Sequence, residues 1–516
     1  MAIEHVFVLM LENRSFDHML GWSGLRGRDA VSGEPTAIEG LTGSEANELP
    51  DGRRVGVGAG ADFVLSVDPG HDFPDVLEQL CGPGAAYDPG RGYPPISSSG
   101  FASRLADLGR RRGLAVDPAT VMRGFRADQL PVLNALASEF ALCDHWFSSL
   151  PGPTWPNRFF VHAATSGGLD DSPSPLRAAE AVLAGYSFEH GTIYDRLDEK
   201  DIPWGVVEGD ALPQVLGIAG MIKCALEGRF LTREELEERL QRPQLRERYV
   251  FMEPHYGHVL ADGSSFKCGN SQHPLDDVTR GERLLKEVYE AVRRSPHWPS
   301  SLLVVLYDEH GGFHDHVAPP AAVPPGDRWL SHVNRHGFAF DRLGVRVPAL
   351  VISPYTRRGV IDHTVYDHTS LLATVEHLWD LEPLTARDRA AERFDHLLDL
   401  AEPRTDAPDT LPEPAVSGEP DCGESLTHQL AGELEDAPAE LSGALELEPA
   451  LVGFVQVALM RELHLAAVLH RDAAVAFEQE RDRLKDAYLG VRSKFDAARL
   501  LRDVQKRYET MRRGGG

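Results

Sequence analysis

Runs of apolar residues at three places predict strands that are buried on both faces of a sheet. Residues 3–11 (IEHVFVLML), 301–307 (SLLVVLY) and 345–353 (VRVPALVIS) are almost continuously apolar and rich in β-branched side chains, which is typical of parallel strands covered by helices. Helical periodicity is found at residues 281–294 (GERLLKEVYEAVRR) and 369–379 (TSLLATVEHLW). Strands that alternate with helices predict an α/β fold with a large, mostly parallel central sheet flanked by helices.

The pattern changes after about residue 400. Residues 401–449 are dominated by proline and acidic residues, which is typical of an acidic linker. Residues 450–516 regain a helical period. We therefore expect a body over residues 1–400, this linker, and a helical C-terminal extension that packs on the body or on a second copy of the chain. In the second case the chain forms a homo-oligomer.

The net charge narrows the classes of partner. The 516 residues include 52 basic and 79 acidic side chains, which gives a net charge of −27 with neutral histidine. Nucleic-acid binding depends on cationic contacts to phosphates, so we expect no nucleic-acid partner. An anionic small substrate is compatible with this charge, because a bound metal can reverse the field inside one cleft.

The cysteines and the N-terminal residues indicate the cellular compartment of the protein. The five cysteines include no CxxC pair, which favours thiols in a reducing compartment over a disulfide framework; they are Cys81, Cys143, Cys224, Cys268 and Cys422. The first residues have none of the parts of a secretory signal. No run of about 18 apolar residues is present. We therefore expect a cytoplasmic protein without a transmembrane segment.

Polar residues follow two of the predicted strands. Glu12 and Asn13 come after the first strand, and Asp308 and Glu309 directly follow the second. Open α/β sheets place their chemistry at the carboxyl ends of strands. Two adjacent carboxylates repel each other unless a cation lies between them, and carboxylate and amide oxygens are ligands for hard divalent cations. The alternative interpretations are a turn at the first position and a solvated loop at the second.

A third cluster surrounds Thr154 in the sequence PGPTWPNR, residues 151–158. A hydroxyl in a proline-restrained turn before a helix is placed to be a nucleophile beside backbone N–H donors. The alternative is an ordinary helix cap.

Four segments, in this order, resemble the bacterial phosphoesterase family that contains the non-haemolytic type of phospholipase C and the burst-inhibiting acid phosphatases, within the alkaline-phosphatase-like superfamily. They are IEHVFVLMLENRSFDHMLG, PGPTWPNRFFVHAATSG, YDEHGGFHDHVAPP and VPALVISPYTRRGVIDHTVYDHTSLLATVEHLW. The resemblance covers roughly residues 3–385. It implies an alkaline-phosphatase-like fold and an enzyme that hydrolyses phosphoric ester bonds.

The resemblance also implies roles for individual residues. The divalent metal would be bound by Glu12, Asn13, Asp308 and Glu309. Catalysis would use Thr154 as a nucleophile that becomes phosphorylated and also touches the metal, His71 at the phosphate, and His273 to protonate the leaving group. Asn157, Arg158 and His310 are predicted to hold the substrate, and a salt bridge in the core is the alternative for Arg158. Oxygen ligands do not choose among Mn, Mg, Ca and Zn.

Two positions depart from the family pattern, and one pair of residues has two alternative roles. Trp155 stands where relatives usually have histidine, and Met19 where they usually have an aromatic residue; both are predicted to alter the mouth of the pocket. Asp367 and His368 precede a helix that starts at Thr369, and they either cap that helix or support the site. We also expect this chain to differ from many relatives in having neither their β-rich C-terminal domain nor their export signal.

The motifs leave the substrate open. Phospholipase C-type cleavage and phosphomonoesterase activity would use the same nucleophile and metal, so the partner is a phosphoester, with a phospholipid as one option. A sulfatase is an alternative because residues 154–158 (TWPNR) keep the Pro and Arg spacing of sulfatases, although threonine cannot be converted to formylglycine. A non-catalytic assembly module is a further alternative, and the four filled ligand positions argue against it.

Overall fold

The computed structural model describes most of the chain, and everything below refers to that part. It comprises residues 3–174, 184–259, 266–329, 332–419, 449–469, 483, 484, 486, 491 and 493–514.

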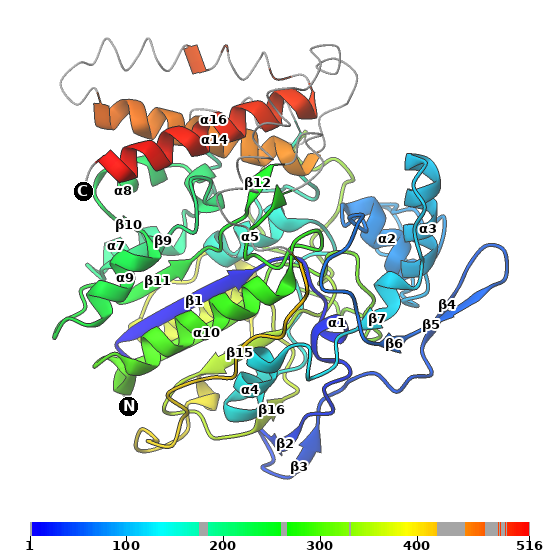
Figure 1. The fold of residues 1–516 in the computed structure, drawn as a ribbon, viewed down its shortest axis with the longest axis horizontal. Helices are drawn as coiled ribbons and strands as arrows, with labels where there is room; N and C mark the ends of the chain where they lie inside the picture. The colour runs from blue at the N-terminus through cyan, green and yellow to red at the C-terminus, as the bar shows by residue number, and fades with distance from the viewer. Residues whose placement is uncertain are drawn as a thin grey trace.

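The described residues form one sheet of ten strands at the centre of the molecule (Figure 1). Six neighbouring pairs are parallel and three are antiparallel, which confirms the α/β class and the mostly parallel sheet. In sheet order the strands are β10 (Phe230–Leu231), β9 (Trp204–Val207), β11 (Tyr249–Met252), β1 (His5–Leu11), β14 (Ser301–Tyr307), β15 (Ala349–Ile352), β8 (Ala141–Cys143), β16 (Val360–Asp362), β2 (Arg26–Asp29) and β3 (Pro35–Ala37).

The first two predicted strands lie side by side and position the polar clusters. β1 and β14 pair in parallel from His5 opposite Ser301 to Leu11 opposite Tyr307, and every residue of both strands is buried. Because Leu11 and Tyr307 are level with each other, the polar residues that follow them emerge at the same edge of the sheet. The third predicted strand, β15, is also buried but runs antiparallel to β14.

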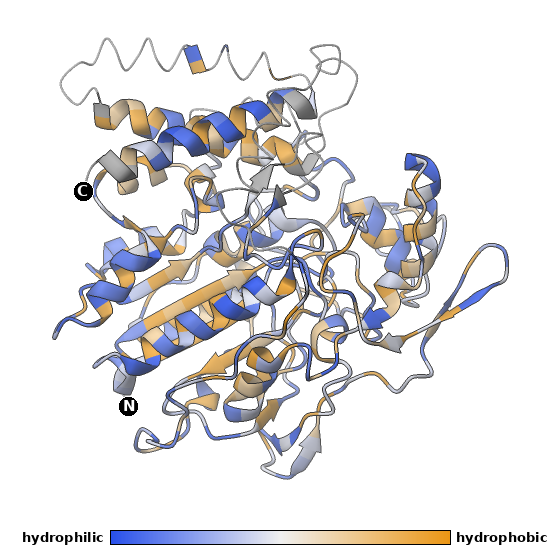
Figure 2. Ribbon diagram, viewed as in Figure 1, coloured by the Kyte–Doolittle hydropathy of each residue, from blue (hydrophilic) through white to orange (hydrophobic). Residues whose placement is uncertain are grey.

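Helices and short hairpins surround this sheet. α10 (Val278–Arg294) runs alongside β1 in Figure 1. It contacts β14, and α5 (Thr154–Ala163) packs against α11 (His368–Trp379). In Figure 2 the central strands are almost uniformly apolar, whereas α10 alternates between apolar and hydrophilic residues, as expected for a helix with one face on the core.

The remaining elements are shorter. The helices are α1 (Phe16–Leu20), α2 (Phe73–Cys81), α3 (Phe101–Arg112), α4 (Pro131–Glu139), α7 (Ile193–Glu199), α8 (Met221–Leu226), α9 (Arg233–Leu240) and α12 (Ala386–Ala390), with 3-10 turns at Thr120–Met122, Gln214–Gly217, Trp298–Ser300 and Asp395–Leu397. The small sheets pair β4 (Ala46–Glu48) with β5 (Arg54–Gly56), β6 (Gly58–Ala59) with β7 (Arg123–Gly124), and β12 (His258–Val259) with β13 (Phe266–Lys267).

The helical C-terminal extension is confirmed. α14 (Pro449–Leu469) and α16 (Lys494–Gly514) pack on each other at the top of the molecule in Figure 1. α14 also contacts α5 and α8, and its apolar residues join the main hydrophobic core. Among the described helices, one window, Leu451–Val468, is long and apolar enough to cross a membrane, and 89% of it is buried inside the protein.

The first part of the expected linker runs along α10. The Tyr289 hydroxyl donates to the Pro408 carbonyl (2.6 Å), Lys286 Nζ donates to the Leu411 carbonyl (2.6 Å), and Arg293 forms an ion pair with Asp409. Residues 404–411 therefore contribute to the packing of the body. Residues 420–448 lie outside the described part of the chain.

One cysteine differs from the expectation of five thiols. Among the cysteines that the structure describes, Cys81, Cys143 and Cys224 are free, whereas Cys268 is disulfide-bonded. The spacing of the cysteines in the sequence contains no CxxC pair, so the pattern held no local sign of this bond.

Candidate active site

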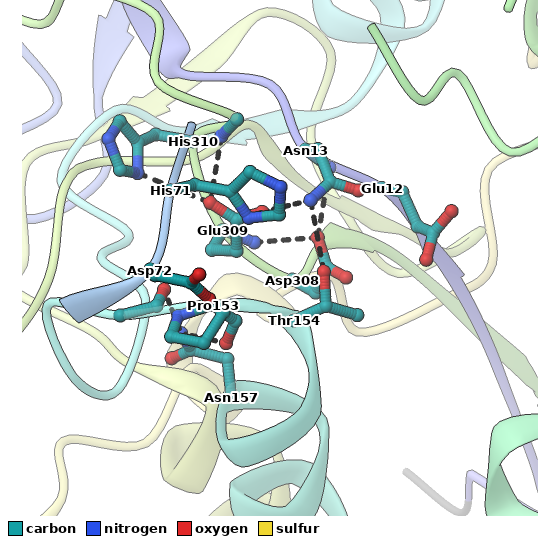
Figure 3. A network of polar contacts seen from close by, with 12 residues as sticks. Glu12, Asn13, His71, Asp72, Pro153, Thr154, Asn157, Asp308, Glu309 and His310 are labelled. Atoms are coloured by element: carbon teal, nitrogen blue, oxygen red, sulfur yellow. Dashed lines mark hydrogen bonds and ion pairs between the residues drawn. The ribbon is translucent and has the colours of Figure 1, made fainter. Parts of the chain in front are cut away.

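Three segments that are far apart in the sequence meet at the end of β1 and β14 (Figure 3). The backbone N–H of Asn13 donates to Asp308 Oδ1 (2.9 Å). The side-chain amide of Asn13 donates to Thr154 Oγ1 (3.0 Å) and contacts Glu309 Oε1. The register of the two strands brings Asn13 to Asp308, and the start of α5 brings Thr154 to both. Four of the predicted site residues are thus in contact or share a partner.

The backbone at this edge is held in an unusual conformation. Asn13 has a φ of 55°, in the left-handed region, and Gly311 has a φ of 63°. A Cβ atom on Gly311 would lie 2.1 Å from the Asn13 carbonyl oxygen. Only glycine fits at position 311, because any side chain there would push the loop that carries Asp308 and Glu309 away from Asn13.

Thr154 is held by the turn that precedes α5. Leu150 N donates to the Asn157 side-chain oxygen (3.1 Å), and Asn157 Nδ2 donates to the carbonyls of Gly152 (2.9 Å) and Pro153 (3.0 Å). Asn157 therefore closes the turn that presents Thr154. Its predicted contact with substrate stays a prediction. The first N–H groups of α5 lie beside Thr154, and helix N-termini favour anions.

Two carboxylates of the site, those of Glu12 and Asp308, are buried beside a single guanidinium, that of Arg158. Arg158 Nε donates to Asp308 Oδ2 (3.1 Å), and Arg158 lies 4.0 Å from Glu12 Oε1. Burial raises the pKa of Glu12 to about 8 and that of Asp308 to about 6, although Arg158 lowers both. A second cation at this position would offset the remaining repulsion.

Arg158 is placed as its alternative interpretation predicted. Its guanidinium is buried, binds Asp308 and stacks over the ring of Tyr256 at 5.5 Å. Its Nη1 has no hydrogen-bond partner within the described part of the chain. The salt bridge in the core is thus present, and a contact with substrate stays a prediction.

The donors at the site fit a hard divalent cation. Asn13 Oδ1 is buried and has no hydrogen-bond partner among the described residues. The carboxylates of Asp308 and Glu309 lie beside it. Glu12 follows the same strand, but its carboxylate points away from Asn13 in Figure 3, and Gln214 Nε2 donates to it (3.2 Å). The structure therefore brings together three of the four predicted metal ligands and places the fourth next to them in the chain.

Histidines surround Glu309. His71 Nδ1 lies 2.9 Å from Glu309 Oε1, and His310 Nδ1 lies 3.3 Å from Glu309 Oε2. Although burial alone would lower it, Glu309 and Asp68 raise the pKa of His71 well above its usual value. Burial would raise the pKa of Glu309, but His71 and His310 together outweigh burial and lower this pKa to about 2. His310 also contacts Gln79 Oε1 (2.8 Å), so it fixes Glu309, and its role in substrate binding stays a prediction.

His273 lies on the far side of Asp68 from Glu309. Its Nε2 is 3.5 Å from Asp68 Oδ2, and burial lowers the pKa of His273 to about 4. The imidazole is then mainly neutral at pH 7, and protonation of a leaving group by His273 stays a prediction.

Both interpretations of the Asp367–His368 pair hold. The Asp367 side chain accepts from Thr369 N (3.1 Å) and caps α11. The His368 ring Nε2 lies 2.7 Å from the Asp308 carbonyl oxygen and donates to it. One residue thus starts the helix, and the next supports the backbone of the loop that carries Asp308 and Glu309.

The two departures from the family pattern lie in the core. Trp155 and Met19 are each 1% exposed. The Trp155 ring packs against Phe454 of α14 at 5.5 Å. Neither side chain therefore lines an open mouth, and Trp155 instead seats the C-terminal extension on α5.

Sequence reasoning missed two residues at the site. Asp68 stands three residues before His71 and faces both His71 and His273, and its position in the segment DPGHD was the available signal. Gln214 binds Glu12 from a 3-10 turn, and nothing in the surrounding sequence singles it out.

Comparison with known proteins identifies the family of this chain. The model of the Phosphoesterase family matches residues 3–382. The chain belongs to the Phosphoesterase family. It is 36% identical to "Non-specific phospholipase C6" and 35% identical to "Non-specific phospholipase C3" of Arabidopsis thaliana, over 86% and 85% of this chain and 81% of each relative. It is 28% identical to "Non-hemolytic phospholipase C" of Burkholderia pseudomallei over 72% of this chain and 55% of that protein.

Solved structures are more distant. A protein of the alkaline phosphatase superfamily from Vibrio parahaemolyticus is 13% identical, with 52% of this chain and 65% of that chain covered and a TM-score of 0.30. Membership of the Phosphoesterase family confirms the family resemblance that the four sequence segments indicated. It also confirms the predicted class of enzyme, a hydrolase of phosphoric ester bonds.

Proposed function

We propose that this phosphoesterase is a divalent-metal-dependent phospholipase C-type hydrolase that forms a covalent phospho-threonine intermediate on Thr154. The observation that carries the proposal is the convergence of the Thr154 hydroxyl, Asn13, Asp308 and Glu309 at the N-terminus of α5. A phospholipid phosphodiester is the proposed substrate, because relatives that are 35–36% identical over most of the chain carry the name phospholipase C.

Hydrolysis proceeds by two displacements at phosphorus. First, Thr154 Oγ1 forms a bond to phosphorus and the ester oxygen of the alcohol leaves with its electron pair. Water then attacks phosphorus, and the Thr154 oxygen leaves. The products are the alcohol and the phosphate monoester of the other substituent. In each step, negative charge moves from the attacking oxygen to the oxygen that leaves.

The residues of this chain prepare the nucleophile. The amide of Asn13 donates to Thr154 Oγ1, which stabilises that oxygen as it loses its proton. Asn157 holds the turn that presents the hydroxyl, and the first N–H groups of α5 face the transferred phosphoryl group. Arg158 keeps Asp308 in place and in its charged form.

A divalent cation would complete this arrangement. Asn13, Asp308 and Glu309 would hold it, together with Glu12 from the same strand end. When bound, it supplies charge neutralisation for the phosphoester and lowers the pKa of the attacking hydroxyl.

The test compares Thr154→Ala with wild type on an aryl phosphate, an aryl phosphodiester and phosphatidylcholine, with added Mn²⁺. We expect wild type to prefer the two diesters and Thr154→Ala to lose at least about 10³-fold in turnover, because no other hydroxyl replaces the nucleophile. Thr154→Ser should keep measurable turnover and, in quenched reactions with phosphatidylcholine, gain the mass of the phosphorylated head group that stays on the hydroxyl. Wild-type rates in Thr154→Ala would refute the intermediate, and a preference for the monoester would identify a phosphomonoesterase instead.

A further inference from the structure

Three neighbouring strands of the central sheet are each followed by a carboxylate. In sheet order, β11, β1 and β14 are followed by Glu253, Glu12 and Asp308. Leu9 of β1 lies opposite Met252 of β11, so Glu253 leaves the sheet at the same edge as Glu12. Glu253 is buried and, unlike the other two, is not among the predicted metal ligands.

The Glu253 carboxylate binds the start of a helical turn. Its Oε2 accepts from the backbone N–H of Gln214 (2.6 Å), and its Oε1 accepts from that of Val215 (2.8 Å). These are the first two residues of the 3-10 turn Gln214–Gly217. The first N–H groups of a helical turn have no partner within the turn, and their bonds to a carboxylate are strong. Glu253 therefore fixes the position of Gln214.

The side chain of Gln214 carries this restraint to Glu12. Gln214 Nε2 donates to Glu12 Oε1 (3.2 Å), while the backbone of Gln214 is held by Glu253. Hydrogen bonds to a metal-binding carboxylate from the residues behind it set its orientation. The orientation of the Glu12 carboxylate thus depends on Glu253, although the two side chains are bridged by a third.

A second chain of contacts leads from Glu253 to Asp308. The Tyr256 hydroxyl donates to Glu253 Oε2 (2.6 Å), and the Arg158 guanidinium lies over the Tyr256 ring at 5.5 Å. Arg158 Nε in turn donates to Asp308 Oδ2 (3.1 Å). A guanidinium is attracted to the face of an aromatic ring, so the orientation of the ring influences the position of Arg158. One buried carboxylate therefore supports both Glu12 and Asp308.

We propose that Glu253 is a positioning residue of the proposed metal centre, which orients Glu12 through Gln214. Through Tyr256 it also supports Arg158. The inference rests on the proposed function, because it assumes that a divalent cation binds at this edge of the sheet. Loss of such outer contacts typically weakens metal affinity or activity by about 10–100-fold, and we expect an effect of this size on removal of the Glu253 charge.

A second glutamate provides a matched control. Glu282 of α10 is buried, and its two carboxylate oxygens accept from the backbone N–H groups of Val132 and Leu133 (both 2.8 Å) at the start of α4. These bonds are of the same kind as those between Glu253 and its turn, but α4 carries none of the predicted site residues. Glu282→Gln therefore measures the cost of such a substitution to the fold alone.

The experiment measures the dissociation constant of Mn²⁺ for the full-length protein without substrate, by electron paramagnetic resonance of the free ion. We expect Glu253→Gln and Gln214→Met each to raise the Kd about 10–100-fold. The double variant should bind no more weakly than Glu253→Gln, because both changes act along one chain of contacts. Tyr256→Phe, which keeps the ring and removes the hydroxyl, should raise the Kd by less than Glu253→Gln.

The control separates positioning from stability. Glu282→Gln should lower the unfolding free energy, measured by urea unfolding, and keep the wild-type Kd for Mn²⁺. An equal rise of the Kd in Glu282→Gln and Glu253→Gln would show that lost stability weakens binding, and would overturn the inference. A wild-type Kd in Tyr256→Phe would overturn the part that concerns Arg158.

A further variant, Asp308→Asn, distinguishes this inference from the proposed function. Loss of Mn²⁺ binding in Asp308→Asn with a wild-type Kd in Glu253→Gln would overturn the inference and leave the proposed function standing. The same Kd in wild type and Asp308→Asn would overturn the proposed metal centre, and the inference with it. Tighter binding in Gln214→Met would show that Gln214 holds Glu12 away from the cation, and would overturn the assigned role. If Glu253→Gln does not fold, Gln214→Met decides: weaker binding supports the inference, and a wild-type Kd overturns it.

Discussion

Two acidic clusters are built from the same pair of segments, those that follow β1 and β14, yet they are neutralised differently. In the cluster of Asp17 and Asp315, Arg346 donates to both carboxylates, and the Asp17 and His316 backbone N–H groups supply further bonds. The fold thus supplies its own cation. Charged hydrogen bonds on all sides make this cluster a structural element.

The cluster at Thr154 is less complete. Arg158 binds Asp308 and remains 4.0 Å from Glu12, while burial raises the pKa of both carboxyls. Burial also raises the pKa of Asp315, so the two clusters differ in their contacts: Arg346 donates to both Asp17 and Asp315, whereas Arg158 donates to Asp308 and only approaches Glu12. The difference indicates that a site for an external cation is recognised by missing counter-charge rather than by acidic residues alone.

The sharpest test exchanges one aspartate in each cluster. Asp308→Asn should reduce turnover by at least about 10³-fold, or about 4 kcal/mol, with little loss of unfolding free energy, because it removes a poorly neutralised buried charge. Asp315→Asn should instead lower the unfolding free energy and keep the turnover of the folded fraction. Steady-state kinetics and denaturant unfolding measure the two effects. Equal effects of both variants would contradict the comparison.

Removing the internal cation tests the structural cluster directly. Arg346→Met should lower the free energy of unfolding by about 3–5 kcal/mol, because two buried carboxylates lose their counter-charge. Urea unfolding followed by circular dichroism measures this, and Arg357→Met, at an exposed surface pair, is the matched control with an expected change below about 1 kcal/mol. A small effect at Arg346 would show that the cluster does not need its guanidinium.

Removal of metal by a chelator should lower the unfolding free energy by less than Arg346→Met does. This effect should come only from the cluster at Thr154. At a Mn²⁺ concentration of about 100 times the dissociation constant, bound metal adds about 2.7 kcal/mol to the unfolding free energy. Differential scanning calorimetry with Mn²⁺ and with chelator should show this gain in wild type and a reduced gain in Asp308→Asn. An identical gain in both proteins would place the ion elsewhere.

The smallest expected effect concerns His316. Burial lowers its pKa, but Asp17 and Asp315 outweigh burial and raise the pKa above its usual value. A histidine with a raised folded-state pKa stabilises the fold below about pH 6.5, and this contribution is lost as the pH rises through the folded-state pKa. His316→Gln should therefore cost about 1 kcal/mol at pH 5.5 and less at pH 9. A cost that grows with pH would reverse the assigned sign.

The strands were predictable because their signal is local. The uninterrupted apolar runs at residues 3–11 and 301–307 predict doubly buried strands, and the polar residues after them predict the edge where chemistry is found. The direction of β15 was not predictable, since a short buried strand has the same apolar pattern in a parallel and an antiparallel pair. The bond at Cys268 was likewise invisible, because its formation depends on distant chain segments.

The grouping of Asn13, Asp308 and Glu309 at one edge of the sheet was predictable from the sequence, but the contacts that support these residues were not. Glu309 and Asn13 could be named from adjacent motifs, whereas the carbonyl contact of His368 and the turn closed by Asn157 depend on three-dimensional packing. Asp68 illustrates this limit of sequence-based prediction. It lies near His273 although the two residues are on different loops, and no periodic pattern in the sequence relates them. The packing of residues 404–411 on α10 also escaped, because proline-rich acidic sequence resembles a linker whether or not it is docked.

The contact between Trp155 and Gly453 has a consequence for how the chain can vary. A Cβ atom at position 453 would lie 2.1 Å from the indole of Trp155, the residue that directly follows Thr154. Substitutions at these two positions therefore cannot be independent: a smaller side chain at 155 would leave a hole under α14, and a larger one at 453 would displace the start of α5. Residues of α14 and residues at the start of α5, beside Thr154, are therefore expected to vary together.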